Sequence, residues 1–434
     1  MMTADFVAIG GFAVLFILLL ARVPIGVAMG MVGIGGFGIL AAWNPALNLL
    51  AISPIRTVTD YSLGLIPMFI LMGAVASASG MSSELYRAAN AFMGHRKGGL
   101  AMATITACGG FSAISGSSVA TAATMSKVAL PEMRRYGYPD SLATGTIAAG
   151  GTLGILIPPS IVLAIYGVLT DTDIGRLFIA GVVPGVLAIL MYLATVRIYL
   201  AVFKIDLPVQ ERAGWGERMA SLKGVWAIIL LFAFVIGGIY GGIFTPSEAA
   251  GMGAAGAIII SAARGRLGWR KLFQCLLESI QVTAGIFMIL IGAILFGYFL
   301  TITQVPQKIA NYLLALDLGA YPTLLIILLF LLLLGCILDA MAMIILMIPI
   351  LFPVAMALGF DPIWFGIVIV MTVELGLITP PIGMNVFVIN SLARDVSLQK
   401  IYAGVMPFVL TDIIRLGLIL LFPAIVLFLP DTMR

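Results

Sequence analysis

A chain of 434 residues that is 62% hydrophobic and only 10% charged has too little polar surface to fold as a soluble globule. Its formal net charge of +4 comes from basic residues that fall between apolar segments, which is typical of membrane topology and not of nucleic-acid binding. The composition therefore predicts an all-α polytopic membrane protein embedded in a lipid bilayer, without a soluble domain and with no nucleic-acid partner.

The chain divides into two similar apolar halves. Its first apolar run, 6–20, lacks the basic start of a signal peptide and leads into more apolar sequence, so we expect it to remain as the first span. Two amphipathic stretches, 82–92 and 269–279, are either surface helices or ordinary loop helices. The predicted organisation is N-terminal scaffold spans at 1–62, a first repeat at 63–203, a cytoplasmic linker at 204–222, scaffold spans with a surface helix at 223–279 and a second repeat at 280–434.

Two apolar segments that are too long for one span are interrupted by polar residues near their middle. Segment 98–131 is interrupted at 115–118, and segment 321–358 is interrupted at Leu338 and Asp339. Each half is too short, or too polar at its tip, to cross a hydrocarbon core of about 30 Å. Both segments are predicted to be re-entrant helical hairpins.

Each hairpin is followed by an apolar segment that contains a Pro-Pro pair. The run TLGILIPPSI occupies 152–161 within segment 139–170, and the run VELGLITPPIGMN occupies 373–385 within segment 362–393. At membrane depth, a broken helix is tolerated only where the freed backbone faces protein or a water-filled cavity. Both segments are predicted to be discontinuous helices that line a binding site.

A single offset of 222 residues, applied without gaps, aligns the two halves. It places the tip residue Ser117 on Asp339, and it matches six positions that are mostly glycine or proline. The matches are Pro131 with Pro353, Gly137 with Gly359, Leu153 with Leu375, Gly154 with Gly376, Pro158 with Pro380 and Pro159 with Pro381. Four predicted crossings separate the two broken helices, so these helices run in opposite directions. Inverted repeats with discontinuous helices are the architecture of secondary transporters.

The basic residues predict the orientation, because cytoplasmic loops carry the excess of Lys and Arg. With the N-terminus outside, most of the 23 Lys and Arg lie at or near the cytoplasmic face. The exceptions are Arg56, Arg176, Lys308 and Arg434 on the outside and Arg415 within the membrane. Both termini are therefore predicted to be outside the cell membrane, which is the periplasmic side in a bacterial inner membrane.

Small and polar residues gather at the first hairpin tip and the first break. They are Ser115, Gly116, Ser117 and Ser118 at the tip, and Thr152, Gly154 and Pro158 at the break. Unwound backbone offers carbonyl oxygens that can replace the hydration shell of a cation, and helix N-termini offer N–H groups to an anion. Close packing of small residues between helices is the alternative.

In the second half, Asp339 and Glu374 are acids within apolar sequence. Intramembrane acids usually mark ion or substrate pathways, although either acid could instead cap a helix or pair with a buried Arg. Asp412 and Arg415 lie three residues apart, so an internal ion pair is expected and a substrate contact is the alternative.

Thr379 and Asn385 are neutral polar residues on either side of the second Pro-Pro pair. Their side chains suit a carboxylate or hydroxyl group that must bind and leave again. A small organic anion is the substrate class that these residues favour.

No catalytic residue and no cofactor are expected. Cys108, Cys275 and Cys336 lack the spacing of a disulfide framework or a zinc site, and a single histidine, His95, cannot supply a catalytic triad or a zinc triad. An intramembrane hydrolase that uses Asp339 with Glu374 is disfavoured, because neither acid has a His or Lys nearby in the sequence. The chain is not expected to be an enzyme.

Five stretches resemble the large membrane subunit of tripartite ATP-independent periplasmic (TRAP) transporters, the DctM-like family. They are FSAISGSS at 111–118, GILIPPS at 154–160, GCILD at 335–339, FDPIW at 360–364 and ELGLITPPIGMNVF at 374–387. The similarity covers nearly the whole chain. It departs at Ala340, where many relatives have Ser after the tip Asp, so no side-chain role is carried over to that position.

The resemblance implies an elevator-type transporter of the ion-transporter superfamily, in which a domain that holds both hairpins and both broken helices slides against a scaffold. It also implies Na⁺ as the coupling ion, a periplasmic substrate-binding protein, a small four-helix membrane subunit and a location in the bacterial inner membrane. Because the chain begins almost directly with its first large-subunit span, the small subunit is expected to be a separate polypeptide.

By position, the resemblance also implies three sites. One Na⁺ is expected at Ser115, Gly116, Ser117, Gly154 and Pro158, a second at Leu338, Gly376, Thr379 and Gly383, and substrate at Ser117, Ser118, Thr152, Asp339 and Asn385. A self-sufficient Na⁺-coupled symporter for organic anions, without a binding protein, is the alternative. A non-transporting scaffold subunit is disfavoured, because it has no need for two broken helices at matched depth.

Overall fold

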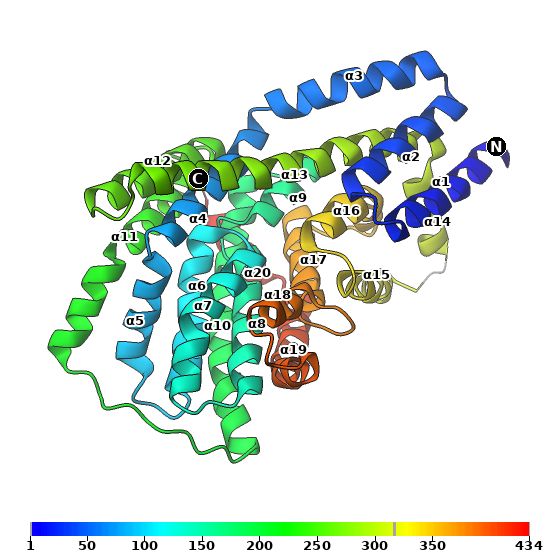
Figure 1. Cartoon of the computed structure of the whole chain (residues 1–434). Helices are drawn as coiled ribbons and strands as arrows, with labels where there is room; N and C mark the ends of the chain where they lie inside the picture. The colour runs from blue at the N-terminus through cyan, green and yellow to red at the C-terminus, as the bar shows by residue number, and fades with distance from the viewer. Residues whose placement is uncertain (1, 316–317, 434) are drawn as a thin grey trace.

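Helices form the whole of the regular structure in the part of the chain that is described. The structure, a computed structural model, describes residues 2–315 and 318–433, apart from the side chains of residues 2, 3 and 314. Within these ranges the chain forms twenty α-helices and two short 3-10 helices, with no strand (Figure 1). Six helices are long and apolar enough to cross a membrane, or seven if a bent pair counts as one span. The prediction of an all-α membrane protein is confirmed.

The first half of the chain comprises α1 (Met2–Leu20), α2 (Ile25–Leu40), α3 (Trp43–Thr59), η1 (Ser62–Gly64), α4 (Leu65–Ala78), α5 (Met81–Met93), α6 (Gly99–Ser115), α7 (Ser118–Arg135), α8 (Asp140–Leu156), α9 (Ile161–Thr170) and α10 (Ile174–Val202). The second half comprises α11 (Trp215–Tyr240), α12 (Pro246–Ala263), α13 (Trp269–Thr303), α14 (Val305–Ala315), α15 (Ala320–Gly335), α16 (Ala340–Ala357), α17 (Pro362–Gly376), α18 (Met384–Leu392), α19 (Leu398–Leu421), α20 (Ala424–Leu427) and η2 (Pro430–Thr432). Residues 203–214 connect the halves without a helix, so the predicted linker 204–222 is helical from Trp215 onward.

Helices of the first half recur about 222 residues later in the second. Helix α7 maps residue for residue onto α16, and the break between α8 and α9 maps onto the break between α17 and α18. The same offset pairs α1 with α11, α2 with α12, α6 with α15 and α10 with α19. The repeat in the order of elements therefore covers nearly the whole chain, and not only the hairpins and broken helices.

The two halves differ before their hairpins. Helices α3 and α4 are bent by 61° relative to each other, whereas their counterpart α13 runs unbroken over 35 residues. The predicted surface helix at 269–279 is wrong as a separate element, and the predicted boundary before residue 280 falls inside α13. The reason is local, since no Gly or Pro occurs in 269–284 to stop the helix. The counterpart of the amphipathic helix α5 is α14, which precedes the second hairpin.

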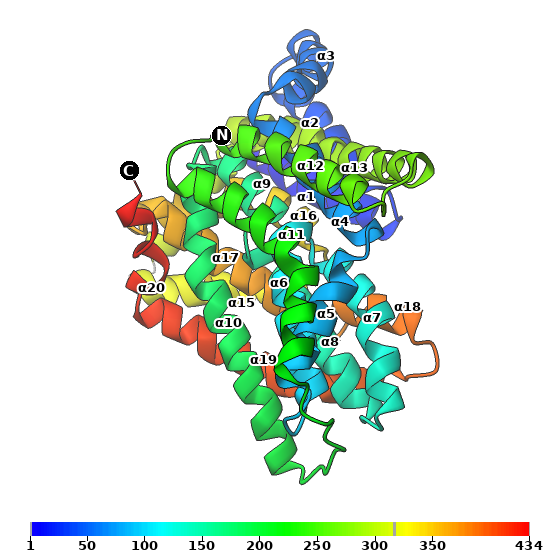
Figure 2. The same ribbon diagram turned by 90° about the vertical axis from the view of Figure 1, so that its left-hand side faces the viewer.

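Close helix packing separates two groups of elements. Helix α13 lies along one side with α2, α3 and α12, while the α6/α7 hairpin lies beside α5, α8 and α10 (Figures 1 and 2). The α2 and α13 backbones touch at Gly26 and Gly292, where a Cβ atom on either residue would overlap the facing helix. Small residues at such contacts are the usual means of close packing in membranes.

Candidate substrate and ion site

The first hairpin tip is a sharp polar turn. Helix α6 ends at Ser115, Gly116 adopts a left-handed conformation with φ of 59°, and Ser117 caps α7 by accepting a hydrogen bond from the Ala120 amide at 3.3 Å. Inside the turn, the hydroxyl groups of Ser115 and Thr121 lie 2.8 Å apart. Glycine suits the left-handed position, because a Cβ atom is disfavoured there.

The tip packs directly against the first break, which spans residues 157–160 between α8 and α9. A methyl group on Gly154 would lie 2.5 Å from the Ser117 carbonyl oxygen, and one on Gly116 would lie 2.7 Å from the Pro159 carbonyl oxygen. Pro158 is buried within the same break. Main-chain oxygens of the tip and of the break therefore face the opposing backbone at close range.

The second tip repeats this arrangement with different side chains. Asp339 caps α16, where its Oδ1 accepts hydrogen bonds from the amides of Met341 at 2.9 Å and Ala342 at 3.1 Å. Capping, which the sequence left open as an alternative for this acid, is thus one role of Asp339. Ser117 caps α7 at the equivalent position. In both tips, a side-chain oxygen of the N-cap residue therefore accepts hydrogen bonds from the first turn of the second helix.

The second tip also packs against its break. A methyl group on Gly376 would lie 2.8 Å from the Gly335 Cα, and the Gly383 amide donates to the Cys336 carbonyl at 3.3 Å. Gly383 has a positive φ of 57°, and the Thr379 hydroxyl donates back to the Leu375 carbonyl at 2.6 Å. Leu338 lies in the same tip, immediately before the capping Asp. The break thus contacts the tip through its main chain at Gly376 and Gly383, and the Thr379 side chain bonds within the break.

One side chain joins the two halves of the site. Asn385, at the start of α18, accepts a hydrogen bond from the Ser118 hydroxyl at 2.8 Å and donates to the Ala148 carbonyl at 3.3 Å. Ser118 and Asn385 are both buried. The second break is therefore anchored to the first hairpin tip and to α8.

An open cleft of about 660 Å³ reaches both hairpin tips. Ser115 and Ser117 line it from the first tip, and Asp339 and Met341 line it from the second. The opposite wall comes from α4 and α13, and Lys127 is the only cation among the described lining residues. The rest of the lining is mainly apolar, with Glu278 of α13 as a second acid besides Asp339, so the charged groups among the described lining residues are Asp339 at the second tip, Glu278 and Lys127.

The predicted substrate residues differ in whether they line the cleft. Ser117 and Asp339 line the cleft, while Ser118 and Asn385 bind each other behind it. Thr152 lies elsewhere, because its hydroxyl donates to the Ala149 carbonyl and faces the hydroxyl of Tyr192 at 3.3 Å. Tyr192 cannot be singled out from the sequence, since a tyrosine in an apolar span has no distinguishing pattern.

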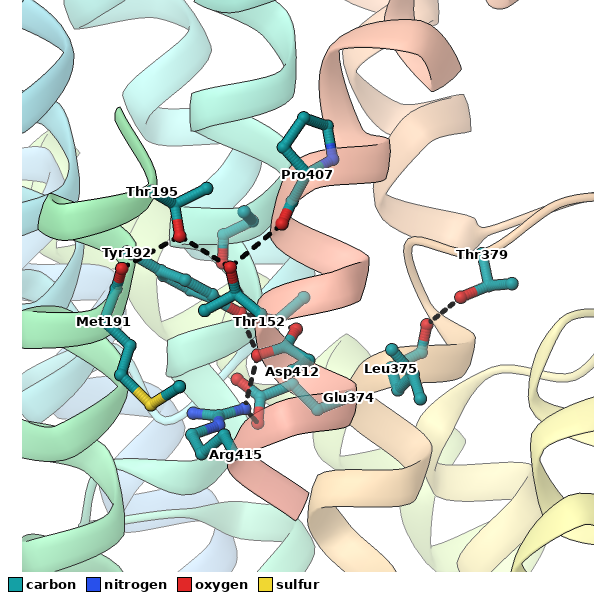
Figure 3. Close-up of polar contacts among 12 residues, drawn as sticks. Thr152, Met191, Tyr192, Thr195, Glu374, Leu375, Thr379, Pro407, Asp412 and Arg415 are labelled. Carbon is teal, nitrogen blue, oxygen red and sulfur yellow. Dashed lines mark hydrogen bonds and ion pairs between the residues drawn. The ribbon is translucent and has the colours of Figure 1, made fainter. Parts of the chain in front are cut away.

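The other two acids that the sequence singles out, Glu374 and Asp412, belong to a buried ionic cluster (Figure 3). Arg415 Nη2 lies 2.7 Å from Glu374 Oε2 and 2.9 Å from Asp412 Oδ1, and all three side chains are at most 2% exposed. The expected pair of Asp412 and Arg415 is confirmed. Glu374 pairs with the same Arg, which is the alternative that the sequence left open, so neither Glu374 nor Arg415 faces the cleft.

No group of three or more His, Cys, Asp or Glu side chains that could hold a metal ion was found among the described residues. The predicted ion ligands are instead the main-chain carbonyls and hydroxyls of the tips and breaks, which suit Na⁺ by the chemistry of hard oxygen donors. Their arrangement is the basis of the proposal below.

Comparisons with known proteins agree with this architecture. The family model of the "Tripartite ATP-independent periplasmic transporter, DctM component" matches residues 12–425. The chain is 39% identical over 406 residues to the C4-dicarboxylate TRAP transporter large permease protein DctM of Pseudomonas aeruginosa, covering 92% of this chain and 93% of the relative. It is 32% identical over 415 residues to the sialic acid TRAP transporter large permease protein SiaM of Vibrio cholerae, covering 95% and 96%.

A solved structure shares the fold at low identity. The YdaH transporter of Alcanivorax borkumensis superposes with a TM-score of 0.63 at 17% sequence identity, covering 88% of this chain and 90% of that one. The relatives are transporter permease subunits and not enzymes, as the sequence predicted. The extent of these matches confirms the resemblance noted in the sequence, and the chain belongs to the DctM family of TRAP transporter large permease subunits.

Proposed function

We propose that this chain is the permease subunit of a Na⁺-coupled, binding-protein-dependent transporter that imports a small organic anion, a carboxylate, by an elevator mechanism. TRAP large permease subunits work with a small membrane subunit and a periplasmic binding protein. The observation that carries the proposal is the convergence of both hairpin tips on one open cleft, with the second break bonded to the first tip through Asn385 and Ser118.

The two proposed Na⁺ sites use the contacts between tips and breaks. The first comprises Ser115, Gly116, Ser117, Gly154 and Pro158, and the second comprises Leu338, Gly376, Thr379 and Gly383. The second site is supported by the approach of two carbonyl oxygens to Gly383, since a methyl group there would lie 3.2 Å from those of both Leu377 and Thr379. Carbonyl and hydroxyl oxygens are suitable replacements for water around Na⁺.

Substrate is proposed to occupy the cleft between Ser117 and Asp339, near Ser118 and Asn385. Thr152 is proposed to act only indirectly, since its hydroxyl group contacts Ala149 and Tyr192 and does not line the cleft. Asp339 takes up the amides of Met341 and Ala342 at the start of α16, so the hydroxyl group of Ser117 at the other tip is the proposed donor to an anion. A carboxylate is also the group that the names of the C4-dicarboxylate and sialic acid relatives share.

The elevator step is supported by the sparse polar contact of α4 with the hairpin. Gly73 of α4 packs against Ser115, and one hydroxyl contact of 3.5 Å joins Ser77 to Thr124. Few hydrogen bonds would therefore have to break for the hairpin to move past α4. In the proposed orientation, which the basic residues predict, the cleft leads from the tips toward Lys127 on the cytoplasmic side of the inner membrane that the family resemblance implies.

Reconstitution tests the proposal. The chain and its small subunit are placed in proteoliposomes, and the ligand of the binding protein is first identified by thermal-shift screening of C4-dicarboxylates and other carboxylates. Uptake is expected only with both the binding protein and an inward Na⁺ gradient, and not with an equal K⁺ gradient. Uptake by this chain alone would support the self-sufficient symporter instead, and uptake that ignores Na⁺ would contradict the proposed coupling.

A further inference from the structure

A continuous chain of buried polar contacts joins the two broken helices, and its two ends occupy equivalent positions in the repeat (Figure 3). Thr152 of α8 forms one end and Glu374 of α17 forms the other, and the offset of 222 residues relates them. Both side chains are fully buried. The contact chain therefore crosses from one half of the protein to the other at matched depth in the repeat.

The middle of this series of polar contacts is formed by residues of α10 and α19. The Tyr192 hydroxyl lies 3.3 Å from the Thr152 hydroxyl, and within 2.7 and 2.8 Å of the two carboxylate oxygens of Asp412. Arg415 then joins Asp412 to Glu374 through a single nitrogen, Nη2, at 2.9 and 2.7 Å. Because one nitrogen serves both acids, Glu374 cannot shift without disturbing Asp412.

This series of polar contacts tolerates little displacement of its side chains. Two carboxyl groups share one guanidinium, and Arg415 Nε and Nη1 together with Glu374 Oε1 have no hydrogen-bond partner among the described residues. Buried charges without spare partners depend strongly on geometry, since losing one contact leaves a desolvated group uncompensated. A movement at one end must therefore be followed at the other.

Each end lies two residues before a glycine that packs on a hairpin tip. Gly154 follows Thr152 and touches Ser117, and Gly376 follows Glu374 and touches Gly335. A shift of either break on ion binding thus acts on one end of the contact chain. These tip-to-break contacts are where the two Na⁺ sites are proposed.

We propose that Tyr192, Asp412 and Arg415 are positioning residues that couple the two Na⁺ sites, so that occupancy of one raises the affinity of the other. The inference rests on the proposed Na⁺ sites. It adds a physical link between them, made by side chains that touch neither the cleft nor the tips. Coupling between sites is a free energy and acts equally in both directions.

Tyr192→Phe is the variant that cuts this link. It removes the hydroxyl between Thr152 and Asp412 and keeps the ring, which packs edge-on against Phe408 at 5.5 Å. Thr195→Val is the matched control. Thr195, one turn after Tyr192 on α10, contacts Thr411, which precedes Asp412 on α19, through hydroxyl groups 2.5 Å apart. Neither threonine is among the polar contacts that reach the two breaks. If Tyr192→Phe is unstable, Thr152→Val removes the same contact between the two hydroxyl groups from the side of Thr152.

The test is a Na⁺ titration of the thermal stability of the purified complex of this chain with its small subunit, without substrate and with K⁺ at matched ionic strength. The parent is expected to respond with a Hill coefficient above one. Tyr192→Phe or Thr152→Val should bring the coefficient to about one and raise the Na⁺ midpoint about fivefold or more. Thr195→Val should keep the parent behaviour.

Each contrary result has its own meaning. A variant with lowered stability but the cooperativity of the parent would show that Tyr192 is merely structural, and it would overturn the inference. A parent that binds Na⁺ with a Hill coefficient of one would do the same. Equal responses of the parent to Na⁺ and K⁺ would instead overturn the proposed Na⁺ coupling itself.

Discussion

Asn385 and Ser118 lie 267 residues apart in the chain and share a hydrogen bond of 2.8 Å between buried side chains. The same Asn also donates to the Ala148 carbonyl at 3.3 Å. Through these bonds, the start of α18 rests on the first hairpin tip and on α8. Side-chain hydrogen bonds therefore connect the second break to the first hairpin.

Removal of the Asn385 side chain should weaken transport without preventing membrane insertion. Asn385→Ala leaves the Ser118 hydroxyl and the Ala148 carbonyl unpaired in a buried position, which costs about 1–3 kcal/mol. We expect uptake to decrease about tenfold at unchanged membrane abundance. Asn390→Ala is the control, since Asn390 bonds only to the nearby Val396 carbonyl at 2.8 Å. Equal losses in both variants would argue against a special role for Asn385.

Glycines at the contacts between tips and breaks should not tolerate a side chain. Gly154→Ala or Gly376→Ala places a methyl group 2.5 Å from the Ser117 carbonyl oxygen or 2.8 Å from the Gly335 Cα, so the backbone must move apart. We expect each variant to lose most Na⁺-dependent uptake. Gly237→Ala in α11 has open space around it and should transport normally. Full uptake by the Gly154 and Gly376 variants would contradict the close approach seen here.

Much of this architecture could be predicted from the sequence because interruptions are rare in apolar segments. The polar residues at 115–118 and the two Pro-Pro pairs mark the tips and breaks, and their fixed offset reveals the repeat. The stretch 269–279 is not the separate helix that the sequence predicts, because amphipathicity does not show where a helix ends. The structure instead continues through this stretch into the long helix α13.

Arg415 should be essential for stability as long as both of its acids are charged. Arg415→Met leaves Glu374 and Asp412 buried without a cation, and breaking such a cluster costs about 3–5 kcal/mol. Thermal unfolding in detergent should show a large loss. The triple variant that adds Glu374→Gln and Asp412→Asn should recover most of it, because no unpaired charge remains.

Arg176→Met is the control for this loss. Arg176 pairs with Asp431 at 3.3 Å, and both side chains are largely exposed, so the pair contributes little. A stability loss of similar size in the two Arg variants would contradict the importance of the buried cluster.

Lys127 should assist the passage of an anion through the cleft. At a separation of about 10 Å in water, one charge contributes about 0.4 kcal/mol, or about a twofold effect. Lys127→Gln should therefore raise the KM for the anion about twofold at low ionic strength, with little change in kcat, and salt should remove the difference. Lys97→Gln serves as the control, since Lys97 lies outside the cleft and pairs with Asp206 at 3.2 Å. A KM that is unaffected at low salt would exclude this role.

The partners of the candidate residues could not be predicted in the same way. Asn385 is recognisable in the sequence as a polar residue beside a break, but nothing in the sequence connects it to Ser118. Glu374 stood out as an acid in apolar sequence, and its pairing with Arg415 depends on how α17 packs against α19. Such contacts are set by tertiary packing between distant segments, which no local pattern encodes.

The most direct test of a single site built by both halves is a double-mutant cycle on Na⁺-driven uptake, using Ser118→Ala, Asn385→Ala and the double variant at equal membrane abundance. If the two side chains act through their shared bond, the double variant should lose little more activity than Asn385→Ala alone. Losses that multiply, as for independent residues, would contradict the claim that the first hairpin tip and the second break form one transport site.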